Sequence, residues 1–371
     1  MKHIKTIQLF ENYNESYQPY IPPVLDALKS SLIEVLIYAF RGKAGSGVKI
    51  LPSYSKRKII QKLCAIARPN QSSLDYVSIL AIRKQVDVLH LQQSYLFPKI
   101  LTLLSIPSDK RPKVVITLRG GDTYVKPWYS KKWFDFYANY GNKVDAFVVM
   151  SQHQKMYLHQ KWDVALSRIH VIPISFGETN NTNEKVADLT ELRIVSAFRM
   201  CWEKNIAGNF RVIRQLKTQG IPVRYDLYGD GVDAGQVYYL VDKYDLKDIV
   251  YYHGRVSNDE LKEKLKQSDF FLQLSHSESL GMSVIEAQSY GLPAIVSSSD
   301  GLPEAIKDGE TGYCVNPYDI DAAANCLKEL WSNPVLYDAF SKAAISYSHS
   351  KFSISNEVTA LEALYKKLVN Q

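Results

Sequence analysis

Short apolar segments rich in β-branched residues alternate along this chain with stretches of helical periodicity. This alternation favours parallel sheets flanked by helices, because the return to a neighbouring parallel strand needs a connection about as long as a helix. A chain of 371 residues is too long for one comfortable core, so two domains are expected. The sequence therefore predicts an α/β protein with two doubly wound domains in tandem.

The expected elements divide between the two halves of the chain. In the first half, strands are expected at 4–10, 86–91, 114–118 and 146–150, and helices at 24–31 and 133–140. In the second half, strands are expected at 193–198, 224–228, 249–252, 270–274 and 294–297, and helices at 207–218, 234–244, 259–267, 282–290 and 320–332. Residues 177–190 are polar, rich in Asn and Thr, and lack an apolar period, which indicates a linker.

Charge is distributed unevenly along the chain. Residues 1–175 hold 25 Lys and Arg against 11 Asp and Glu, whereas the remaining residues hold 20 against 27. A basic first half and an acidic second half suggest that the two domains meet different partners. Nucleic acid is not favoured as the partner of the basic half, because no recognised binding module accompanies the charge.

The sequence gives no sign of a membrane span, an export signal or a bound metal. No apolar run reaches the roughly 18 residues of a spanning helix, and the first 20 residues lack the apolar stretch of a secretion signal. The four cysteines and eight histidines show neither metal-ligand nor redox spacing. A cytoplasmic protein with no metal and no cofactor is therefore expected.

The most informative segment follows the fourth strand expected in the second half. There a polar loop contains Glu278, and Gly281 opens a helix that carries Glu286. The helix start at Leu280, Gly281 and Met282 offers unpaired N–H groups and the positive end of the helix dipole, which suits a diphosphate. Glu286 is placed to accept hydrogen bonds from two ribose hydroxyls, and Glu278 to reach a sugar beyond the phosphates. The alternative is that both glutamates are solvated and bind nothing.

Two cations follow the first strand of the second half. Arg199 and Lys204 lie in a loop at the carboxyl end of that strand, where a guanidinium and an ammonium can converge on a diphosphate. There they would stabilise the charge that develops as a nucleotide leaves, so that no magnesium ion is needed. The alternative is a pair of exposed basic residues before a helix.

These residues belong to a longer pattern. The string SxxExxGxxxxEAxxxGxPxxxS starts at Ser275 and is followed by DGLPE at 300–304 and DGETG at 308–312. Together with the R-x4-K spacing of Arg199 and Lys204, it resembles the signature of the retaining GT-B glycosyltransferases of group 1, the glycogen-synthase-like family 4 type. Along the second domain the resemblance is nearly continuous.

The resemblance implies an architecture and further contacts. It implies two Rossmann-like domains facing each other across a cleft, with residues 1–176 on the acceptor side and 188–350 binding the nucleotide-sugar. A last helix at about 353–371 would cross back to the first domain. The backbone at Val256, after a strand expected to end at Tyr252, would meet the nucleotide base. Gly229 would lie in a G-x-G turn near the ligand, although a tight turn alone also explains a glycine there.

The first domain resembles the family less closely. Residues 117–122, TLRGGD, stand where many members have T-x-H-G-x-D, so Arg119 replaces a histidine that reaches the donor sugar. A permanent cation would bind phosphate or an acidic sugar there instead of shuttling a proton, unless Arg119 is structural and bonds loop carbonyls. No glycine precedes Gly42, so the glycine turn that many members carry after the first strand is missing, and residues 11–16 occupy that stretch. Ser279 stands where glycine often follows the first glutamate.

Two basic segments of the first domain suggest its partner. Lys56, Arg57, Lys58 and Lys62 share a segment with Ile59, Ile60, Leu63 and Ile66, which could form one helical face, and residues 124–137 mix lysines with aromatic residues. Such segments suit an anionic membrane surface or a lipid-diphosphate acceptor held there. The alternative is a solvated surface beside a buried helix face.

The sequence as a whole favours a metal-independent glycosyltransferase. It would move a sugar from a nucleotide-diphosphate donor to a glycan or lipid-linked acceptor, with retention of configuration, in cell-surface polysaccharide or glycolipid synthesis. Such an enzyme would be cytoplasmic and peripheral on the inner face of the membrane. Two alternatives remain at this point: a sugar-nucleotide epimerase of the same architecture, and a non-catalytic protein that binds nucleotide-sugars or scaffolds a partner.

Overall fold

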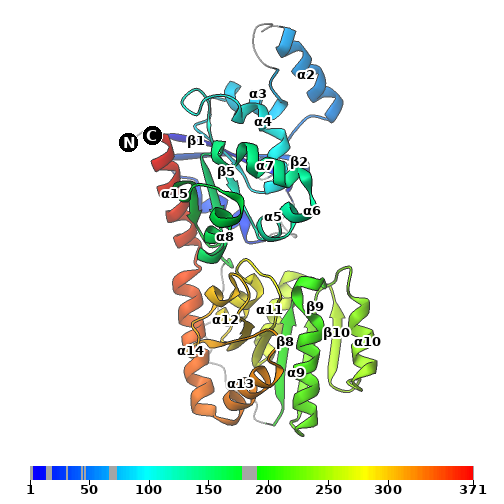
Figure 1. Ribbon diagram of the computed structural model, residues 1–371. Coiled ribbons are helices and arrows are strands. Elements are labelled where there is room, and N and C mark those ends of the chain that lie inside the picture. The colour runs from blue at the N-terminus through cyan, green and yellow to red at the C-terminus, as the bar shows by residue number, and fades with distance from the viewer. Residues whose placement is uncertain are drawn as a thin grey trace. The chain divides into compact units, whose positions relative to one another are not determined.

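The computed structural model describes residues 3–13, 19–30, 32–42, 45, 47–66, 73–177 and 190–370. It divides into two compact units (Figure 1), which are Met1–Gly177 with Ile354–Gln371 (unit 1) and Glu178–Ser353 (unit 2). The linker expected at 177–190 lies almost wholly outside the described residues. From the sequence, the first domain was expected to end at 176, the second to start at 188, and the chain to return at about 353.

Unit 1 is built on a parallel sheet of seven strands in the order β3-β2-β1-β4-β5-β6-β7. Its strands are β1 (Ile4–Tyr13), β2 (Ile33–Gly42), β3 (Val48–Ile50), β4 (Val88–Leu91), β5 (Lys113–Thr117), β6 (Ala146–Val149) and β7 (Ile169–Val171). Its helices are α1 (Ile21–Leu28), α2 (Tyr54–Ile66), α3 (Tyr76–Arg83), η1 (Ser94–Lys99), α4 (Leu101–Leu104), α5 (Gly121–Tyr124), α6 (Lys126–Tyr129), α7 (Lys131–Tyr140), η2 (Gly141–Lys143), α8 (Gln152–Trp162), η3 (Leu166–Arg168) and α15 (Ile354–Val369).

Unit 2 has a second parallel sheet, of six strands in the order β10-β9-β8-β11-β12-β13. Its strands are β8 (Leu192–Ala197), β9 (Val223–Tyr228), β10 (Val250–Gly254), β11 (Phe270–Gln273), β12 (Ala294–Ser297) and β13 (Gly312–Val315). Its helices are η4 (Trp202–Lys204), α9 (Ile206–Thr218), α10 (Gly235–Lys243), α11 (Asn258–Gln267), α12 (Met282–Ser289), η5 (Leu302–Ala305), α13 (Ile320–Ser332) and α14 (Pro334–Lys351).

Both sheets change direction at one point in their strand order. Chain order runs outward from β1 to β3 and then resumes from β4 on the other side of β1, and in unit 2 the same switch separates β8 from β11. The loops after the two strands at a switch diverge to opposite faces, which leaves a crevice at their carboxyl ends where α/β proteins bind ligands. Central strands such as β4, β6, β11 and β12 are buried along their whole length, as parallel strands covered on both faces should be.

Local sequence explains where several helices start. Asn205 adopts the left-handed region and its side chain accepts a hydrogen bond from the Gly208 amide, capping α9. The Asn333 side chain accepts from the Leu336 amide and caps α14, and Pro334 at its first position separates α14 from α13. Gly291 ends α12 at φ +78°, and a β-carbon there would lie 2.6 Å from the Ser341 hydroxyl oxygen.

Some expected elements were displaced or missed. The helix expected at 24–31 runs over Ile21–Leu28, because the prolines after Ile21 suit the first turn of a helix. The strand expected at 249–252 continues through Gly254, so His253 and Gly254 belong to β10. β2 and β3 were not predicted, nor were β7 and β13, because an apolar run without alternation and three- or four-residue strands carry little periodicity.

The last helix belongs to the N-terminal unit. α15 packs on α1 and β1, and its Tyr365 hydroxyl bonds with Gln8 of β1 and His90 of β4. Within the described ranges, no helix combines the length and the apolar character that crossing a bilayer requires.

Candidate functional site

The switch point of the unit 2 sheet brings together most of the residues singled out from the sequence. The loop after β8 carries Arg199 and Lys204, and the loop after β11 carries Glu278 and leads into α12. Because β8 and β11 are neighbours in the sheet, two segments separated by about seventy residues in the chain meet at one edge. This edge is the usual ligand position in such a fold.

Lys204 and Glu278 form an ion pair across the two loops. The Lys204 ammonium donates to Oε2 of Glu278, and both side chains are largely buried. The same oxygen accepts from Gln273 Nε2 at 3.1 Å, and Oε1 accepts from the Ser279 amide at 3.1 Å. Three donors therefore hold the Glu278 carboxylate, and this carboxylate in turn fixes the position of the ammonium.

The second cation remains accessible. Arg199 is 71% exposed, and its Nη2 lies 3.8 Å from Oε1 of Glu203. The Glu203 carbonyl accepts from the amides of His276 at 2.7 Å and Ser277 at 3.3 Å, which ties the loop after β8 to the loop after β11. Arg199 and Lys204 therefore come from one loop that is tied to the loop after β11. Lys204 is largely buried, whereas Arg199 is exposed.

The start of α12 has the geometry expected of an anion-binding helix end. Gly281 has φ +87°, and a β-carbon there would lie 2.4 Å from Leu302 Cδ1, so the position requires glycine. No side chain caps the helix, so the amides of Met282 and its neighbour have no partner inside it. Leu280, immediately before the turn, is buried and anchors it.

Glu286 lies one turn further along α12 and is half-buried. Burial raises the pKa of its carboxyl to about 7, and the Lys262 ammonium only partly offsets this. Among the described residues no hydrogen bond to its carboxylate is seen, in contrast to Glu278. A carboxylate that is partly desolvated and not yet paired is suited to accept hydrogen bonds from a bound polyol.

The glycine turn after β9 is explained by packing. Gly229 has φ +116°, and a β-carbon there would lie 1.9 Å from the Phe198 carbonyl oxygen. The loop that carries Arg199 is joined to this turn by bonds from the Met200 amide to Asp230 at 3.1 Å and from the Asp233 amide to Met200 at 3.0 Å. Gly229 is therefore needed for close backbone approach. Val256, half-buried in the turn after β10, lies on the same edge of the sheet.

Arg119 lies at the carboxyl edge of the unit 1 sheet, in the loop after β5. The Asp122 carboxylate accepts from the amides of Arg119 at 3.1 Å and Gly120 at 3.0 Å and from the Ser94 hydroxyl, so the loop is folded back on itself. The guanidinium makes a long hydrogen bond of 3.5 Å with Gln92 Oε1 and lies 6.0 Å from the Tyr20 ring centroid. Gln92 follows β4 directly, so this bond links the loop after β5 to the loop after β4.

Behind Arg119 lies a buried network of uncharged groups. His90 bonds through Nδ1 to the Tyr365 hydroxyl at 2.6 Å and through Nε2 to the Thr117 hydroxyl at 2.7 Å. Burial, with a smaller contribution from the Arg119 cation, lowers the pKa of His90 to about 3, so this imidazole is neutral at physiological pH. Gln8 and Gln92 continue the network toward Arg119 through a 2.9 Å bond.

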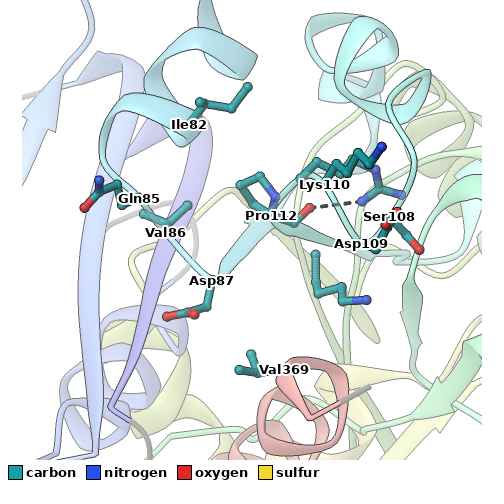
Figure 2. A pocket seen from close by; sticks show the side chains of 11 residues that line it. Ile82, Gln85, Val86, Asp87, Ser108, Asp109, Lys110, Pro112 and Val369 are labelled. Carbon is teal, nitrogen blue, oxygen red and sulfur yellow. Dashed lines mark hydrogen bonds between the residues drawn. The ribbon is translucent and has the colours of Figure 1, made fainter.

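A further pocket of about 530 Å³ lies at the opposite edge of the unit 1 sheet (Figure 2). Asp87 and Lys113, at the amino ends of β4 and β5, line it together with Lys110 and Val369. Because this pocket lies at the amino ends of the strands, it is remote from the carboxyl edge that carries Arg119. In the part of the chain that the structure describes, no group of three His, Cys, Asp or Glu side chains is placed to hold a metal ion.

Sequence reasoning missed several residues that build the site. Gln273 donates to Glu278, and Glu203 lies beside Arg199. The loop after β11 is also held to the next loop, because Ser277 donates to Asp300 at 2.6 Å and the Gly301 amide donates to the Glu278 carbonyl. A polar residue at the end of an otherwise apolar strand was the available signal for Gln273. Nothing comparable distinguishes Glu203, because its role depends on a carbonyl and on a loop distant in sequence.

Two family models match the chain, one in each unit. The model for glycosyl transferases group 1 matches residues 178–347, and the model for glycosyltransferase family 4 matches residues 25–174. The putative colanic acid biosynthesis glycosyltransferase WcaL of Escherichia coli K12 is 30% identical over 147 residues, covering 38% of this chain and 36% of that protein. The alpha-D-kanosaminyltransferase of Streptomyces kanamyceticus is matched over 64% of its own length and WcaL over 36%, both less than two thirds.

Solved structures match nearly the whole chain. A glycosyltransferase from Rickettsia africae ESF-5 superposes with a TM-score of 0.74 at 18% identity, covering 99% of both chains. Anabaena Alr3699/HepE, solved with UDP and glucose, superposes with a TM-score of 0.73 at 13% identity, covering 98% of this chain and 100% of that one. At these identities the likeness shows the fold, which is the GT-B type with two Rossmann-like α/β domains, as the sequence predicted.

Proposed function

Because the chain belongs to the group 1, family 4 type of glycosyltransferases, we propose that it transfers a sugar from a nucleotide-diphosphate donor to a glycan or lipid-linked acceptor. The observation that carries this proposal is the Lys204–Glu278 pair beside the uncapped start of α12. A fixed ammonium and a helix N-terminus at one sheet edge form an anion site built for a diphosphate.

The donor would lie along the carboxyl edge of the unit 2 sheet. Its diphosphate would meet the amides at Met282 and the Lys204 ammonium, and its ribose hydroxyls would donate to Glu286. Val256 and Gly229, in the turns after β10 and β9, would lie toward the base, and Glu278 toward the sugar. HepE, with the same fold, was solved with UDP and glucose, which favours a uridine nucleotide for this chain as well.

The reaction would depend on fixed cations that stabilise the negative charge of the leaving diphosphate. As the bond between the anomeric carbon and the phosphate oxygen breaks, negative charge grows on the leaving diphosphate, where Lys204 and Arg199 supply positive charge without reorganising. With these cations a metal ion is not needed. A leaving phosphate oxygen would take the proton of the attacking hydroxyl on the same face, and the configuration would be retained.

The acceptor would be recognised in unit 1, with Arg119 as the cation that binds its phosphate or an acidic sugar. Similarity to WcaL, whose name refers to colanic acid biosynthesis, supports cell-surface polysaccharide or glycolipid synthesis as the pathway. Such an acceptor would place the enzyme in the cytoplasm, on the inner face of the membrane.

The test is turnover of a panel of UDP-, GDP- and ADP-sugars, followed as release of nucleoside diphosphate with and without a polyprenyl-diphosphate sugar acceptor. Acceptor-dependent release, with retained configuration in the product by NMR, is the expected result. An isomerised nucleotide-sugar formed without acceptor would instead identify an epimerase. Donor binding without turnover under any condition would identify a binding protein.

A further inference from the structure

The surface of unit 1 contains one concentration of exposed apolar side chains. Of eleven large hydrophobic residues exposed in the described part of unit 1, eight belong to α2, η1, α6 and α7. These four elements contain eight Lys and Arg and a single acidic residue, Asp135. Exposed apolar groups are ordinary when scattered, but their concentration among cations indicates an interaction surface.

α2 is the most exposed part of this surface. No residue of the helix is buried, and Figure 1 shows it on the periphery of unit 1. The sequence had allowed a buried face made of Ile59, Ile60, Leu63 and Ile66; this is wrong, because Ile59, Leu63 and Ile66 are 57%, 60% and 76% exposed. The helix contacts α3 through its other side, where Cys64 Sγ accepts from Arg83 Nη2 at 3.3 Å.

The exposed residues of α2 form an amphipathic pattern turned outward. Ile59, Leu63 and Ile66 are four and three residues apart and therefore form one stripe. Lys62 and Lys56 lie about 60° to either side of that stripe at 100° per residue. A lysine beside an apolar stripe can bury its stem in an apolar phase while its ammonium stays in water.

The second basic segment of the sequence is joined to the first by tertiary contacts. Arg57 of α2 stacks on Phe40 at 4.7 Å, and Lys99 of η1 approaches the same ring at 5.8 Å. At the other end of η1, the Tyr95 ring faces Lys126 of α6 at 5.8 Å. We call the exposed residues of α2, η1, α6 and α7 together the basic–aromatic strip.

The α6–α7 end of the strip contributes aromatic rings. Trp128, Tyr129 and Phe134 are all exposed, and Lys131 and Lys132 lie between them in the chain. Trp and Tyr are enriched where a protein meets the headgroups of a bilayer, because their rings have an apolar body and a polar edge.

We propose that the basic–aromatic strip docks this protein onto an anionic lipid surface, with Ile59, Leu63 and Ile66 inserted among the headgroups and the surrounding lysines paired with lipid phosphates. The positive charge of the strip is complementary to the negative charge of such a lipid surface. A second copy of the chain would present the same positive strip, and like charges would oppose that contact.

The strip also leads toward the acceptor side of unit 1. η1 begins at Ser94, whose hydroxyl donates to the Asp122 carboxylate that holds the Arg119 loop. A lipid-linked acceptor anchored in the bilayer would thus have its diphosphate presented near Arg119. This last point rests on the proposed function, whereas the lipid docking does not.

The test measures sedimentation of the full chain with phosphatidylglycerol–phosphatidylcholine vesicles and with pure phosphatidylcholine vesicles. The wild type should bind the anionic vesicles, and salt should weaken this binding. The triple variant Ile59→Gln, Leu63→Gln, Ile66→Gln should lose at least about tenfold in binding. Its control is Val232→Gln with Val335→Gln, which removes exposed apolar groups of unit 2.

Lysine variants separate the electrostatic contribution to vesicle binding from the contribution of apolar insertion. Lys58→Gln with Lys62→Gln should weaken binding by about fivefold for each lysine, whereas Lys247→Gln with Lys342→Gln should leave it unchanged. Trp128→Phe should remove the quenching of fluorescence by brominated lipid, whereas Trp202→Phe should not. All substituted side chains of α2 are exposed or lie at its surface, so melting temperatures should match the wild type.

Equal binding of anionic and neutral vesicles, or full binding by the triple variant, overturns the proposal. Self-association that the triple variant abolishes, without vesicle binding, overturns it in favour of a dimer surface. Donor turnover on a soluble acceptor should be the same in wild type and α2 variants. Vesicle binding without any turnover would defeat the proposed function and leave the docking surface standing.

Discussion

The two units place different chemistry at the same position of the same kind of sheet. At the switch point of unit 2, charged side chains pair across loops, as Lys204 does with Glu278. At the switch point of unit 1, the central groups are neutral and buried, with His90, Gln8 and Tyr365 bonded to one another and Arg119 at the rim. A charged loop can bind a charged ligand strongly, whereas a neutral network fixes the shape of its surface without committing it to one ligand.

The largest expected effect tests the charged side of this contrast. Lys204→Ala should lower kcat by about 10²–10³, because in the proposed reaction charge would develop on the leaving diphosphate beside this ammonium. Nucleoside diphosphate release measures it, and Lys247→Ala, an exposed lysine of unit 2, is the control. A kcat within about threefold of the wild type would mean that the pair is structural and that the contrast has no catalytic meaning.

The second effect tests the neutral network of unit 1 through the stability of the protein. The pKa of His90 is about 3 in the folded chain and about 6.5 when unfolded, so the unfolded state binds more protons between these values. The free energy of unfolding should therefore fall as pH drops below 6.5, by about 2 kcal/mol at pH 5. His90→Gln should remove this contribution to the slope in urea titrations, and His349→Gln on α14 should keep it. An unchanged slope in His90→Gln would show that the network tolerates a charge.

The third effect concerns Glu286, whose pKa of about 7 reflects burial in the unbound chain. Ionised Glu286 accepts hydrogen bonds best, so the Kd for donor should fall as pH rises from 6 to 8. Glu286→Gln should weaken donor binding by about tenfold and remove the pH dependence. Calorimetry on a hydrolysis-resistant donor analogue measures both. The same dependence in the variant would place the titrating group elsewhere.

A smaller effect should distinguish the two units by the substrate whose KM changes. Arg119→Gln should raise the KM for an anionic acceptor by several-fold, since it removes one charged hydrogen bond at a rim position. The KM for donor should change less, whereas Arg199→Gln should show the opposite split. If both variants alter only the donor KM, Arg119 belongs with the donor site.

The smallest expected effect is that of metal removal. Turnover should stay within about twofold after treatment with EDTA, because in the proposed reaction Lys204 and Arg199 would supply the charge that a magnesium ion otherwise supplies. A loss of activity that magnesium restores would require a metal-bridged diphosphate and a different role for these cations.

Sequence patterns predicted unit 2 better than unit 1 for a physical reason. The candidate charged residues of unit 2 lie within short segments at fixed spacings, as in R-x4-K and E-x7-E, so the sequence alone shows the pattern. The unit 1 network joins β1, β4, β5 and α15, and the bond from Gln8 to Tyr365 spans 357 residues. No local periodicity reveals such a contact.

From the sequence alone came the parallel α/β class and the loops that carry Arg199, Lys204, Glu278 and Gly281, because strand periodicity and glycine conformation are local properties. Tertiary structure alone decided that Lys204 pairs with Glu278, that Gln273 orients this pair, and that the apolar stripe of α2 faces solvent. Pairing and exposure depend on which segments the sheet order brings together, and a linear pattern does not contain that order.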